Sequence, residues 1–484
     1  MRGSMGVSHV TEAAEKTGAP PPLPHRITVV GAGVSGISLG RFAASRGVQT
    51  FVSDQKALRE DQKNSLAEAG ILWEEGHTPR ALETDLLLLS SGISPQAPLV
   101  REARDRGIAI KGELSFLRPY LRGRLVGITG SNGKSTTVTL LGHMLQREGR
   151  AVAVAGNVGT PLGDVADRPY DIVVMELSSF QLHWSEGLPL ECGAITNLDP
   201  DHIDWHGSYE SYVAAKMNIF CGLSSSGAIV AQSREWASIP EGERHRVLLL
   251  GEEGDPRASL VLSSRGAILR RGHGSTVLFS RDDLPLLGRH NEENAAMAMA
   301  LAVLLGEDPE VLRPRMATYS PLPHRCAFVT RWEDVTFVDD SKGTNVAASV
   351  TALRSLEGPK VVILGGRGKG ESYDSLAKAV KECARWALIM GEERPRLLEA
   401  LHRGGVEGVT EVSGMEEAVQ EAFSRALPGD TVLLSPACTS WDAYENYGAR
   451  GDHFVALVKK EMERRQKCGR EASPATDGSS HPGF

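Results

Sequence analysis

The sequence has few cysteines, and their positions form no pair. Six cysteines are spread over 484 residues, and no two of them stand in a C-x-x-C motif. A disulfide framework or a cysteine-based metal site would need such spacing, so neither is expected to organise the fold. This cysteine usage is typical of a reducing compartment.

The chain also lacks long apolar runs and an excess of basic residues. No run of 18 apolar residues is present, so no membrane span is expected. The 53 lysines and arginines are outnumbered by 61 aspartates and glutamates, which gives a net charge of −8. A nucleic-acid partner would call for a basic face, so none is expected. The first residues have no signal-peptide centre, and we expect a cytoplasmic protein.

What the chain does contain is a β–α rhythm that starts three times. RITVVGAGVSGISLG predicts a strand, a glycine turn and a helix from Arg26, and LVGITGSNGKSTT and KVVILGGRGKG repeat this order. The alternation is typical of α/β domains with parallel sheets. We predict three α/β domains in series, over 26–120, 121–320 and 321–466. The polar, proline-rich ends predict a disordered lead over 1–25 and a disordered tail over 467–484.

The first glycine turn indicates a nucleotide site in the first domain. Gly31, Gly33 and Gly36 follow a predicted strand and open a helix, whose backbone N–H groups can cradle a pyrophosphate. Asp54 closes the next strand, where dinucleotide enzymes place a ribose-binding acid. A tight turn without a ligand would give the same pattern, and so would a nicotinamide dehydrogenase.

The stretch ITGSNGKSTT, residues 128–137, indicates a second nucleotide site. It differs from the pattern G-x-x-x-x-G-K-[ST], because Ile128 stands where the first glycine belongs. Lys134 can reach terminal phosphates, the Ser135 hydroxyl suits Mg²⁺, and the start of the following helix favours anions. A turn without a ligand would not need a lysine and a hydroxyl in this order.

Acidic residues and histidines follow the next strands. Glu176 ends the apolar strand DIVVM, where a further magnesium ligand is expected, although a solvated carboxylate is the alternative. One short loop then holds Asp199, Asp201, His202, Asp204 and His206. This loop suggests metal or phosphate binding, or else a polar loop, and zinc is disfavoured because the cluster has no cysteine. Lys216, on the next predicted helix, would by itself be a solvated charge.

Each of four fragments of the third domain places cationic or hydroxyl side chains at the end of a predicted strand. They contain Arg325 in PHR, Asp340, Ser341, Lys342, Thr344 and Asn345 in VDDSKGTN, Arg367 and Lys369 in GGRGKG, and Ser435, Ser440 and Tyr447 in SPACTSWDAYENYG. Such groups can clamp a small dianion. Any one fragment could be a solvated turn, but that explanation fits all four poorly.

Together these motifs resemble the Mur ligases, the ATP-dependent amide-bond formers of bacterial cell-wall synthesis. The resemblance spans about residues 26–465 and includes the loop T-G-x-N-G-K-[ST], whose spacing accounts for Ile128. It also includes GN-x-G with Asn157, E-x-SS-x-QL with Glu176, DH-x-D with His202, and the lysine at Lys216. DSKGTN and SPACTSWDAYENYGARG are similar to the D-glutamate-adding branch of that family.

The resemblance implies a Rossmann-like UDP-binding domain, a central P-loop-type ATPase domain with a parallel sheet, and a Rossmann-like C-terminal domain. It implies a monomeric ligase whose substrates are UDP-N-acetylmuramoyl-L-alanine, D-glutamate and ATP. The ATP γ-phosphate would activate the alanyl carboxylate as an acyl phosphate, which the amine of D-glutamate attacks. Two Mg²⁺ ions and a CO₂-derived carbamate on Lys216 would assist.

The resemblance also assigns roles to residues. The metal set is Ser135, Glu176, His202 and Lys216, and the catalytic set is Lys134, Glu176, His202, Lys216 and Lys342. ATP would contact Gly130, Ser131, Asn132, Gly133, Lys134, Ser135, Thr136, Asn291, Asn294, Arg325 and Asp340. The UDP substrate would contact Gly33, Val34, Ser35, Asp54, Gln55, Gly92, Asn157, Ser178 and Gln181, and D-glutamate would contact Thr344, Lys369, Ser440 and Tyr447.

Three other functions remain compatible with parts of the sequence. A folylpolyglutamate-type ligase would share the central and third domains but would lack the first glycine turn. A nucleotide-binding module without chemistry would not need Lys134, Glu176, His202 and Lys216 together. A nicotinamide dehydrogenase would rest on the first glycine turn alone.

Overall fold

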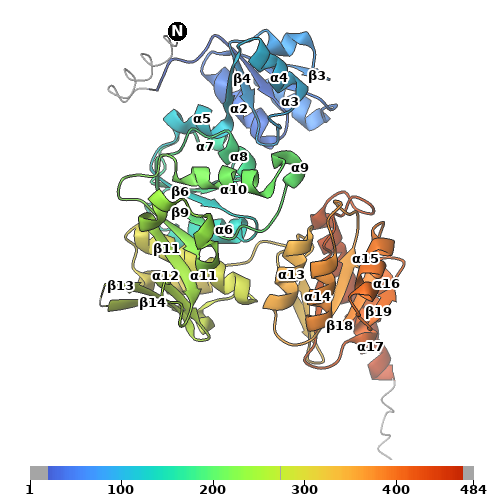
Figure 1. Cartoon of the computed structure of the whole chain (residues 1–484). Helices are drawn as coiled ribbons and strands as arrows, with labels where there is room; N and C mark the ends of the chain where they lie inside the picture. The colour runs from blue at the N-terminus through green and yellow to red at the C-terminus, as the bar shows by residue number, and fades with distance from the viewer. Residues whose placement is uncertain (1–19, 273, 472–484) are drawn as a thin grey trace, which may run out of the picture. The chain divides into compact units, whose positions relative to one another are not determined.

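The computed structural model describes residues 20–272 and 274–471 in two compact units. The first unit contains the chain up to Pro285 together with Glu293–Tyr319, and the second contains Leu286–Glu292 and the chain from Ser320 onward (Figure 1). Most of the predicted disordered lead and tail lies outside the described residues. The domain boundaries drawn from the sequence stay predictions.

The first unit begins with a parallel sheet of five strands in the order β3-β2-β1-β4-β5. Its strands are β1 (Arg26–Val30), β2 (Gln49–Asp54), β3 (Leu72–Glu75), β4 (Leu86–Leu89) and β5 (Ala109–Gly112), and its helices are α2 (Val34–Ser45), α3 (Glu60–Glu68), α4 (Pro98–Asp105) and α5 (Glu113–Leu117). All four residues of β4 are buried leucines, as expected for an inner strand of a parallel sheet covered on both faces. The chain order reverses between β1 and β4, so ligands are expected at the carboxyl ends of these two strands.

A second sheet in the same unit has nine strands in the order β14-β13-β12-β11-β10-β9-β6-β8-β7. They are β6 (Arg124–Thr129), β7 (Val152–Gly156), β8 (Ile172–Glu176), β9 (Leu190–Ile195), β10 (Ala228–Gln232), β11 (Val247–Glu252), β12 (Leu260–Ser263), β13 (Gly266–Arg271) and β14 (Gly274–Ser280). The helices of this region are α6 (Lys134–Leu145), α7 (Leu162–Val165), α8 (Ser179–His183), α9 (Ile203–His206), α10 (Tyr209–Met217), α11 (Arg289–Leu304) and α12 (Pro309–Ala317). Only β13 and β14 run antiparallel to their neighbours.

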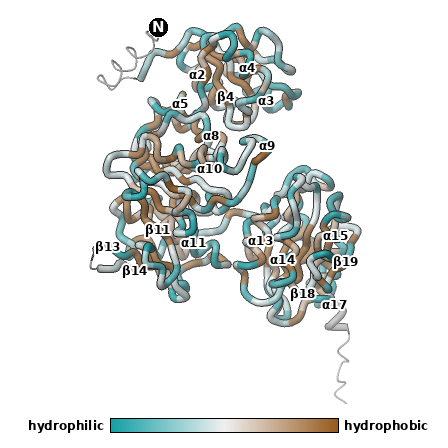
Figure 2. The backbone as a smooth tube through the Cα atoms, in the orientation of Figure 1, coloured by the Kyte–Doolittle hydropathy of each residue, from teal (hydrophilic) through white to brown (hydrophobic). Residues whose placement is uncertain are grey.

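The two sheets of the first unit share one hydrophobic core. A single cluster of buried side chains runs from Ile27 in β1 to Leu249 in β11. Between the sheets, the Phe42 ring of α2 lies 5.0 Å from the Tyr120 ring, and Ser38 Oγ donates to Asp164 Oδ1 at 3.0 Å. Hydrophobic stretches of the chain lie mostly on the strands and on the helix faces that cover them (Figure 2). Apolar burial across this junction stabilises both sheets together.

The second unit contains a six-stranded sheet in the order β15-β16-β20-β17-β18-β19. Its strands are β15 (Ala327–Trp332), β16 (Val335–Asp339), β17 (Lys360–Gly365), β18 (Ala384–Met390), β19 (Val409–Glu411) and β20 (Thr431–Leu434), and its helices are α13 (Val346–Ser355), α14 (Asp374–Cys383), α15 (Arg394–Arg403), α16 (Met415–Arg425) and α17 (Tyr447–Glu471). Only β15 is antiparallel. In the described part of the chain, no helix is long and apolar enough to cross a membrane. The prediction of an α/β protein with three parallel-rich sheets is confirmed.

Candidate active site

The loop between β6 and α6 needs both of its glycines. Gly130 and Gly133 have φ values of 139° and 83°, which residues with a Cβ rarely adopt. A Cβ on Gly130 would lie 1.9 Å from Thr196 Oγ1, and one on Gly133 would lie 2.3 Å from Asn294 Oδ1. Lys134 folds back over this loop, and its Nζ donates to the carbonyl oxygens of Gly130 and Ser131, both at 2.8 Å. The loop therefore brings a lysine to the start of α6, where anions are favoured.

Three of the predicted residues meet at the carboxyl edge of β6, β8 and β7, which are neighbours in the sheet. Ser135 Oγ donates to Glu176 Oε2 at 2.5 Å, and Asn157 Nδ2 donates to Glu176 Oε1 at 2.8 Å. Glu176 is buried, with 2% of its surface exposed. Gly156 is required here as well, since a Cβ would lie 2.3 Å from the Glu176 carbonyl oxygen. These three residues lie far apart in the sequence, and the parallel pairing of β6, β8 and β7 brings their side chains together.

Lys216 of α10 lies beside the same loop. Only 2% of its surface is exposed, and its Nζ donates to the Gly130 carbonyl oxygen at 2.7 Å. The Nζ also lies 4.6 Å from the centre of the Tyr212 ring. Burial, and then the nearby Lys134 ammonium, hold the pKa of Lys216 well below its ordinary value. Lys216 is therefore not the solvated charge that its sequence context allowed.

The acidic loop after β9 presents His202 at the start of α9. This residue has a positive φ of 52°, its Nε2 lies 3.4 Å from Asp201 Oδ2, and its ring centre lies 4.7 Å from that of Phe180. His206 faces inward instead, with Nε2 3.0 Å from Ser179 Oγ, and burial lowers its pKa to about 4. The loop thus holds one exposed histidine and, four residues later, one that is half-buried.

The donors at this edge fit Mg²⁺ better than zinc. Ser135 Oγ and Glu176 Oε2 are hard oxygen donors next to a phosphate-type loop, which suits a cation that keeps water and phosphate ligands. Among the described residues, no three His, Cys, Asp or Glu side chains gather as a closed metal cluster. An open, oxygen-rich site of this kind is typical of nucleotide-bound magnesium.

Of the other ATP-side residues, several have structural partners. Ser131 Oγ turns inward to the Asp199 carbonyl oxygen and the Tyr212 hydroxyl, at 2.7 and 2.6 Å. The Asn132 N–H donates to Asn197 Oδ1 at 2.8 Å, and Thr136 is half-buried in the first turn of α6. In the second unit, Asn291 Nδ2 donates to the Leu287 carbonyl oxygen at 2.7 Å.

The glycine turn of the first sheet is tightly built and is open on one side. A Cβ on Gly36 would lie 1.8 Å from the Gly31 carbonyl oxygen, whereas one on Gly33 would meet nothing within 4 Å. Asp54 is engaged with backbone amides, because its Oδ2 accepts from the Ala32 N–H at 2.6 Å and its Oδ1 from the Lys56 N–H at 2.8 Å. Of the remaining predicted contacts, Val34, Gln55 and Gly92 are exposed and Ser35 is half-buried.

Two predicted substrate contacts act as a helix cap in this structure. Ser178 Oγ accepts from the Gln181 N–H at 3.2 Å, while Gln181 Oε1 accepts from the Ser178 N–H at 2.9 Å, which is a capping box at the start of α8. Gln181 is buried, and its Nε2 donates to Glu113 Oε2 at 2.8 Å. Their direct contact with substrate stays a prediction.

In the second unit, three predicted fragments converge because β16, β20 and β17 are neighbours and parallel. Ser435 Oγ donates to Asp340 Oδ2 at 2.7 Å, and burial raises the pKa of Asp340 to about 7. The Lys342 Nζ lies 4.2 Å from the centre of the Tyr447 ring. Thr344 and Arg325 are half-buried, Ser440 is buried, and Lys369 is exposed.

Two features of this unit had no clear signal in the sequence. Arg450 is buried with 1% of its surface exposed, and its guanidinium joins two loops by donating to the Ser341 carbonyl oxygen at 2.8 Å and the Cys438 carbonyl oxygen at 3.1 Å. His324 Nδ1 lies 2.7 Å from Asp339 Oδ2 and holds the PHR segment on the strand end. Arg367, in contrast, forms an exposed ion pair with Glu392 at 2.8 Å.

Three family models match successive parts of the chain. A profile described as the MurD N-terminal domain matches residues 26–99, the Mur ligase middle domain matches 128–302, and the Mur ligase glutamate ligase domain matches 324–438. This chain belongs to the Mur ligase family. The resemblance inferred from the loop and strand-end motifs is thereby confirmed.

The relatives of this Mur ligase match it over nearly their whole length. The UDP-N-acetylmuramoylalanine–D-glutamate ligase of Symbiobacterium thermophilum is 37% identical over 448 residues, which covers 90% of this chain and 98% of the relative. The enzyme of the same name from Salinibacter ruber is 36% identical over 451 residues, with coverages of 90% and 97%.

Solved structures of the family share the fold. A pseudomurein peptide ligase type C from Methanothermus fervidus aligns with a TM-score of 0.57 at 18% identity, covering 90% of this chain and all of that one. MurF from Acinetobacter baumannii aligns with a TM-score of 0.56 at 18% identity, covering 94% and 98%. At this identity the likeness supports the fold alone.

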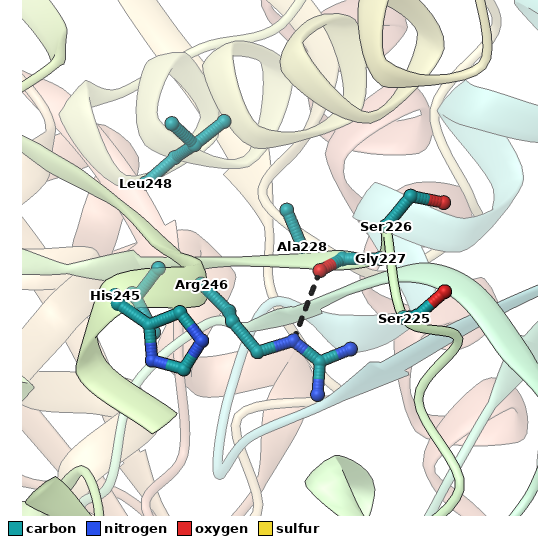
Figure 3. Close-up of a pocket in the computed structure, with 8 residues that line it drawn as sticks. Ser225, Ser226, Gly227, Ala228, His245, Arg246 and Leu248 are labelled. Carbon is teal, nitrogen blue, oxygen red and sulfur yellow. Dashed lines mark hydrogen bonds between the residues drawn. The ribbon is translucent and has the colours of Figure 1, made fainter. Parts of the chain in front are cut away.

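This Mur ligase also has a shallow pocket away from these residues. It measures about 290 Å³ and is lined by Ser225–Ala228 and His245–Leu248. The Arg246 side chain extends across the pocket, and its Nε donates to the Gly227 carbonyl oxygen at 3.3 Å (Figure 3). The pocket lies at the starts of β10 and β11, whereas the β6–α6 loop follows the carboxyl end of β6 in the same parallel set. It is therefore on the opposite edge from the candidate active site.

Proposed function

We propose that this protein is an ATP-dependent ligase that joins D-glutamate to UDP-N-acetylmuramoyl-L-alanine, with ADP and phosphate as the other products, in peptidoglycan precursor synthesis. The observation that carries the chemistry is the group formed by Ser135, Glu176, Lys134 and Lys216 around one phosphate-type loop. The near full-length likeness to ligases named for D-glutamate supports the choice of substrates.

The reaction requires two anions to meet. A carboxylate is a poor acyl donor, so the alanyl carboxylate must first take the γ-phosphate of ATP to become an acyl phosphate. Lys134 neutralises charge on the β- and γ-phosphates, and the N–H groups at the start of α6 orient them. Mg²⁺, which Mur ligases use with ATP, supplies further charge neutralisation between phosphate and carboxylate when bound. Ser135, Glu176 and His202 would hold the two ions.

Lys216 favours carbamate formation because its environment disfavours the ammonium form. Its Nζ is buried and shares the Gly130 carbonyl oxygen with the Lys134 Nζ. A neutral amine can attack CO₂, forming an N–C bond and releasing one proton to solvent. The product is an anionic carbamate that suits the neighbouring Lys134 ammonium and a magnesium ion. We propose this carbamate as part of the active enzyme.

The substrate contacts remain assignments by resemblance. We propose that D-glutamate is bound by Thr344, Lys369, Ser440 and Tyr447, and that Arg325, Asp340 and Lys342 face ATP and the acyl phosphate. The tight turn at Gly31–Gly36 and Asp54 are assigned to the UDP part. Cytoplasmic location and a monomeric state stay predictions.

The decisive experiment measures phosphate release from ATP by the purified full-length chain. Release should require both UDP-N-acetylmuramoyl-L-alanine and D-glutamate, and a product of the expected mass should appear. L-Glutamate and L-alanine serve as matched controls. Equal release with either control amino acid, or release that does not depend on the UDP substrate, would overturn the proposal.

A further inference from the structure

Two tryptophan side chains hold one loop of the first sheet. The Trp205 Nε1–H of α9 donates to the Gly92 carbonyl oxygen at 3.2 Å, and the Trp184 Nε1–H donates to the next carbonyl, that of Ile93, at 3.3 Å. Trp184 is the residue that caps the C-terminus of α8. Two indole donors from the second-sheet region therefore bind successive carbonyl groups of residues 90–95, which we call the β4 loop.

The β4 loop borders the glycine turn at the reversal point of the first sheet. It follows the carboxyl end of β4, the neighbour of β1. A Cβ on Gly31 would lie 2.3 Å from Ser90 Oγ, so the loop and the turn are in direct contact. A ligand in the turn would therefore meet the β4 loop, and the loop's position depends on the two indoles.

Trp205 makes a ring contact with Phe180 that Trp184 does not make. Its ring centre lies 4.8 Å from that of Phe180, and the Phe180 ring centre lies 4.7 Å from the His202 ring. Trp184 packs at the junction of the sheets, where its carbonyl oxygen accepts from Ser115 Oγ at 2.9 Å and the Arg104 guanidinium lies 5.6 Å from its ring. Its ring centre also lies 5.2 Å from that of His183, which lies 5.2 Å from the Trp205 ring. A continuous series of contacts thus runs from Gly92 through Trp205 and Phe180 to His202.

We infer that Trp205 is a positioning residue that links the UDP-substrate side of the active site to His202 through Phe180, while Trp184 anchors the β4 loop and meets these rings through His183. The inference rests on the proposed function, because it assigns the glycine turn to the UDP substrate and His202 to the metal side. Edge-to-face and tilted ring pairs hold a preferred geometry, so a shift of the Trp205 indole displaces the Phe180 and His202 rings. Substrate binding that fixes the position of the β4 loop would in this way also fix the position of the His202 ring.

The test compares three single substitutions that each remove one indole N–H hydrogen bond. Trp205→Phe and Trp184→Phe remove a donor to the β4 loop, while Trp386→Phe removes the matched bond to Thr410 Oγ1, 2.8 Å long, in the second unit. Trp205→Ala removes the ring contacts as well. Hydrogen exchange of residues 90–95 is measured in the free protein, and the Kd for UDP-N-acetylmuramoyl-L-alanine is measured by calorimetry without ATP or Mg²⁺.

Both loop substitutions should speed hydrogen exchange in the β4 loop and weaken substrate binding by about two- to tenfold, the usual worth of one neutral hydrogen bond. Trp386→Phe should change neither. Only Trp205→Ala should also raise the Mg²⁺ concentration needed for half-maximal phosphate release. Unchanged exchange and Kd in Trp205→Phe would overturn the anchoring, and an equal Mg²⁺ requirement in Trp205→Ala and Trp184→Phe would overturn the link to His202.

The same data separate this inference from the proposed function. If wild-type protein failed to bind the UDP substrate, the proposed function would be overturned, and the link with it. Faster exchange of residues 90–95 in Trp205→Phe would then still establish the loop anchoring as a property of the fold. A normal wild-type Kd with variants that do not differ from wild type would overturn the anchoring and the link but not the proposed function.

Discussion

At the scale of single residues, Lys216 carries the most specific chemistry. Replacing it with alanine removes the amine on which the carbamate forms, so phosphate release should fall by about 10- to 100-fold or more, as for loss of a group that orients a metal site. Acetate or formate added to the alanine variant should restore part of the rate by supplying a carboxylate. Lys216→Arg, which cannot form the carbamate, should not respond to these acids. Full activity of the alanine variant would contradict the proposal.

Glu113 is a second residue with a testable charge state. It is buried, one of its oxygens has no hydrogen-bond partner among the described residues, and burial raises its pKa. The folded protein therefore keeps this proton at pH values where the unfolded chain has lost it. The free energy of unfolding falls as pH rises from about 4.5 through the raised pKa of Glu113.

Glu113→Gln keeps the shape and the acceptor for Gln181 but cannot ionise. The variant should therefore gain stability relative to wild type as pH rises from about 5 to 8, measured as the difference in urea unfolding midpoints. The same variant should keep phosphate release near the wild-type level at pH 7. Parallel pH profiles of the two proteins would show that Glu113 ionises normally in the fold.

The hydrogen-bond partners of individual side chains were the part of the structure that the sequence predicted least. The motif spacing singled out Lys134, Ser135 and Glu176, and the family resemblance added Lys216, but neither indicated that both lysines share the Gly130 carbonyl oxygen. The resemblance assigned Gln181 to substrate, which stays a prediction, but did not indicate that its side chain also caps a helix and binds Glu113. These bonds join residues far apart in the chain, and local pattern contains no information on which distant side chain lies opposite.

At the scale of elements, the β1–α2 turn allows a matched pair of substitutions. Gly36→Ala would place a methyl group 1.8 Å from the Gly31 carbonyl oxygen, whereas Gly33→Ala meets open space. We expect the first to lower the free energy of unfolding by about 1–3 kcal/mol, a usual cost of overpacking. The second should cost less than about 1 kcal/mol, since it changes only the helix N-cap. Urea unfolding of both variants checks this, and equal losses would contradict it.

Elements with uniform apolar runs were predictable, and those with mixed sequence were not. Inner parallel strands such as β4, β8 and β17 are almost wholly apolar and end in small or polar residues, which is a strong signal. The strands β12, β13 and β14 were not predicted; they extend the second sheet, β12 in parallel with β11 and then β13 and β14 in antiparallel pairing. β14 has four exposed positions in a row, so its pattern is that of a surface segment.

At the scale of the whole molecule, ligand binding should reveal which elements unfold cooperatively with the substrate site. One core cluster of the first unit contains side chains of both its sheets, so both sheets should unfold together. UDP-N-acetylmuramoyl-L-alanine at 100 times its Kd would raise the free energy of unfolding by about 2.7 kcal/mol for every element that unfolds together with its binding site. Near the unfolding midpoint, hydrogen exchange should slow by a similar factor in β1 and in β11, although only the first sheet carries the proposed UDP site.

Strands of the second unit, such as β17, serve as the internal control for that measurement. They belong to separate core clusters, so the same ligand should leave their exchange by global opening unchanged. Protection confined to the first sheet would mean that the shared core does not couple the two sheets energetically. In that case the bonds of Trp184 and Trp205 to the β4 loop would be lost when one sheet opens alone, and they could carry an effect of substrate to His202 only while both sheets are folded.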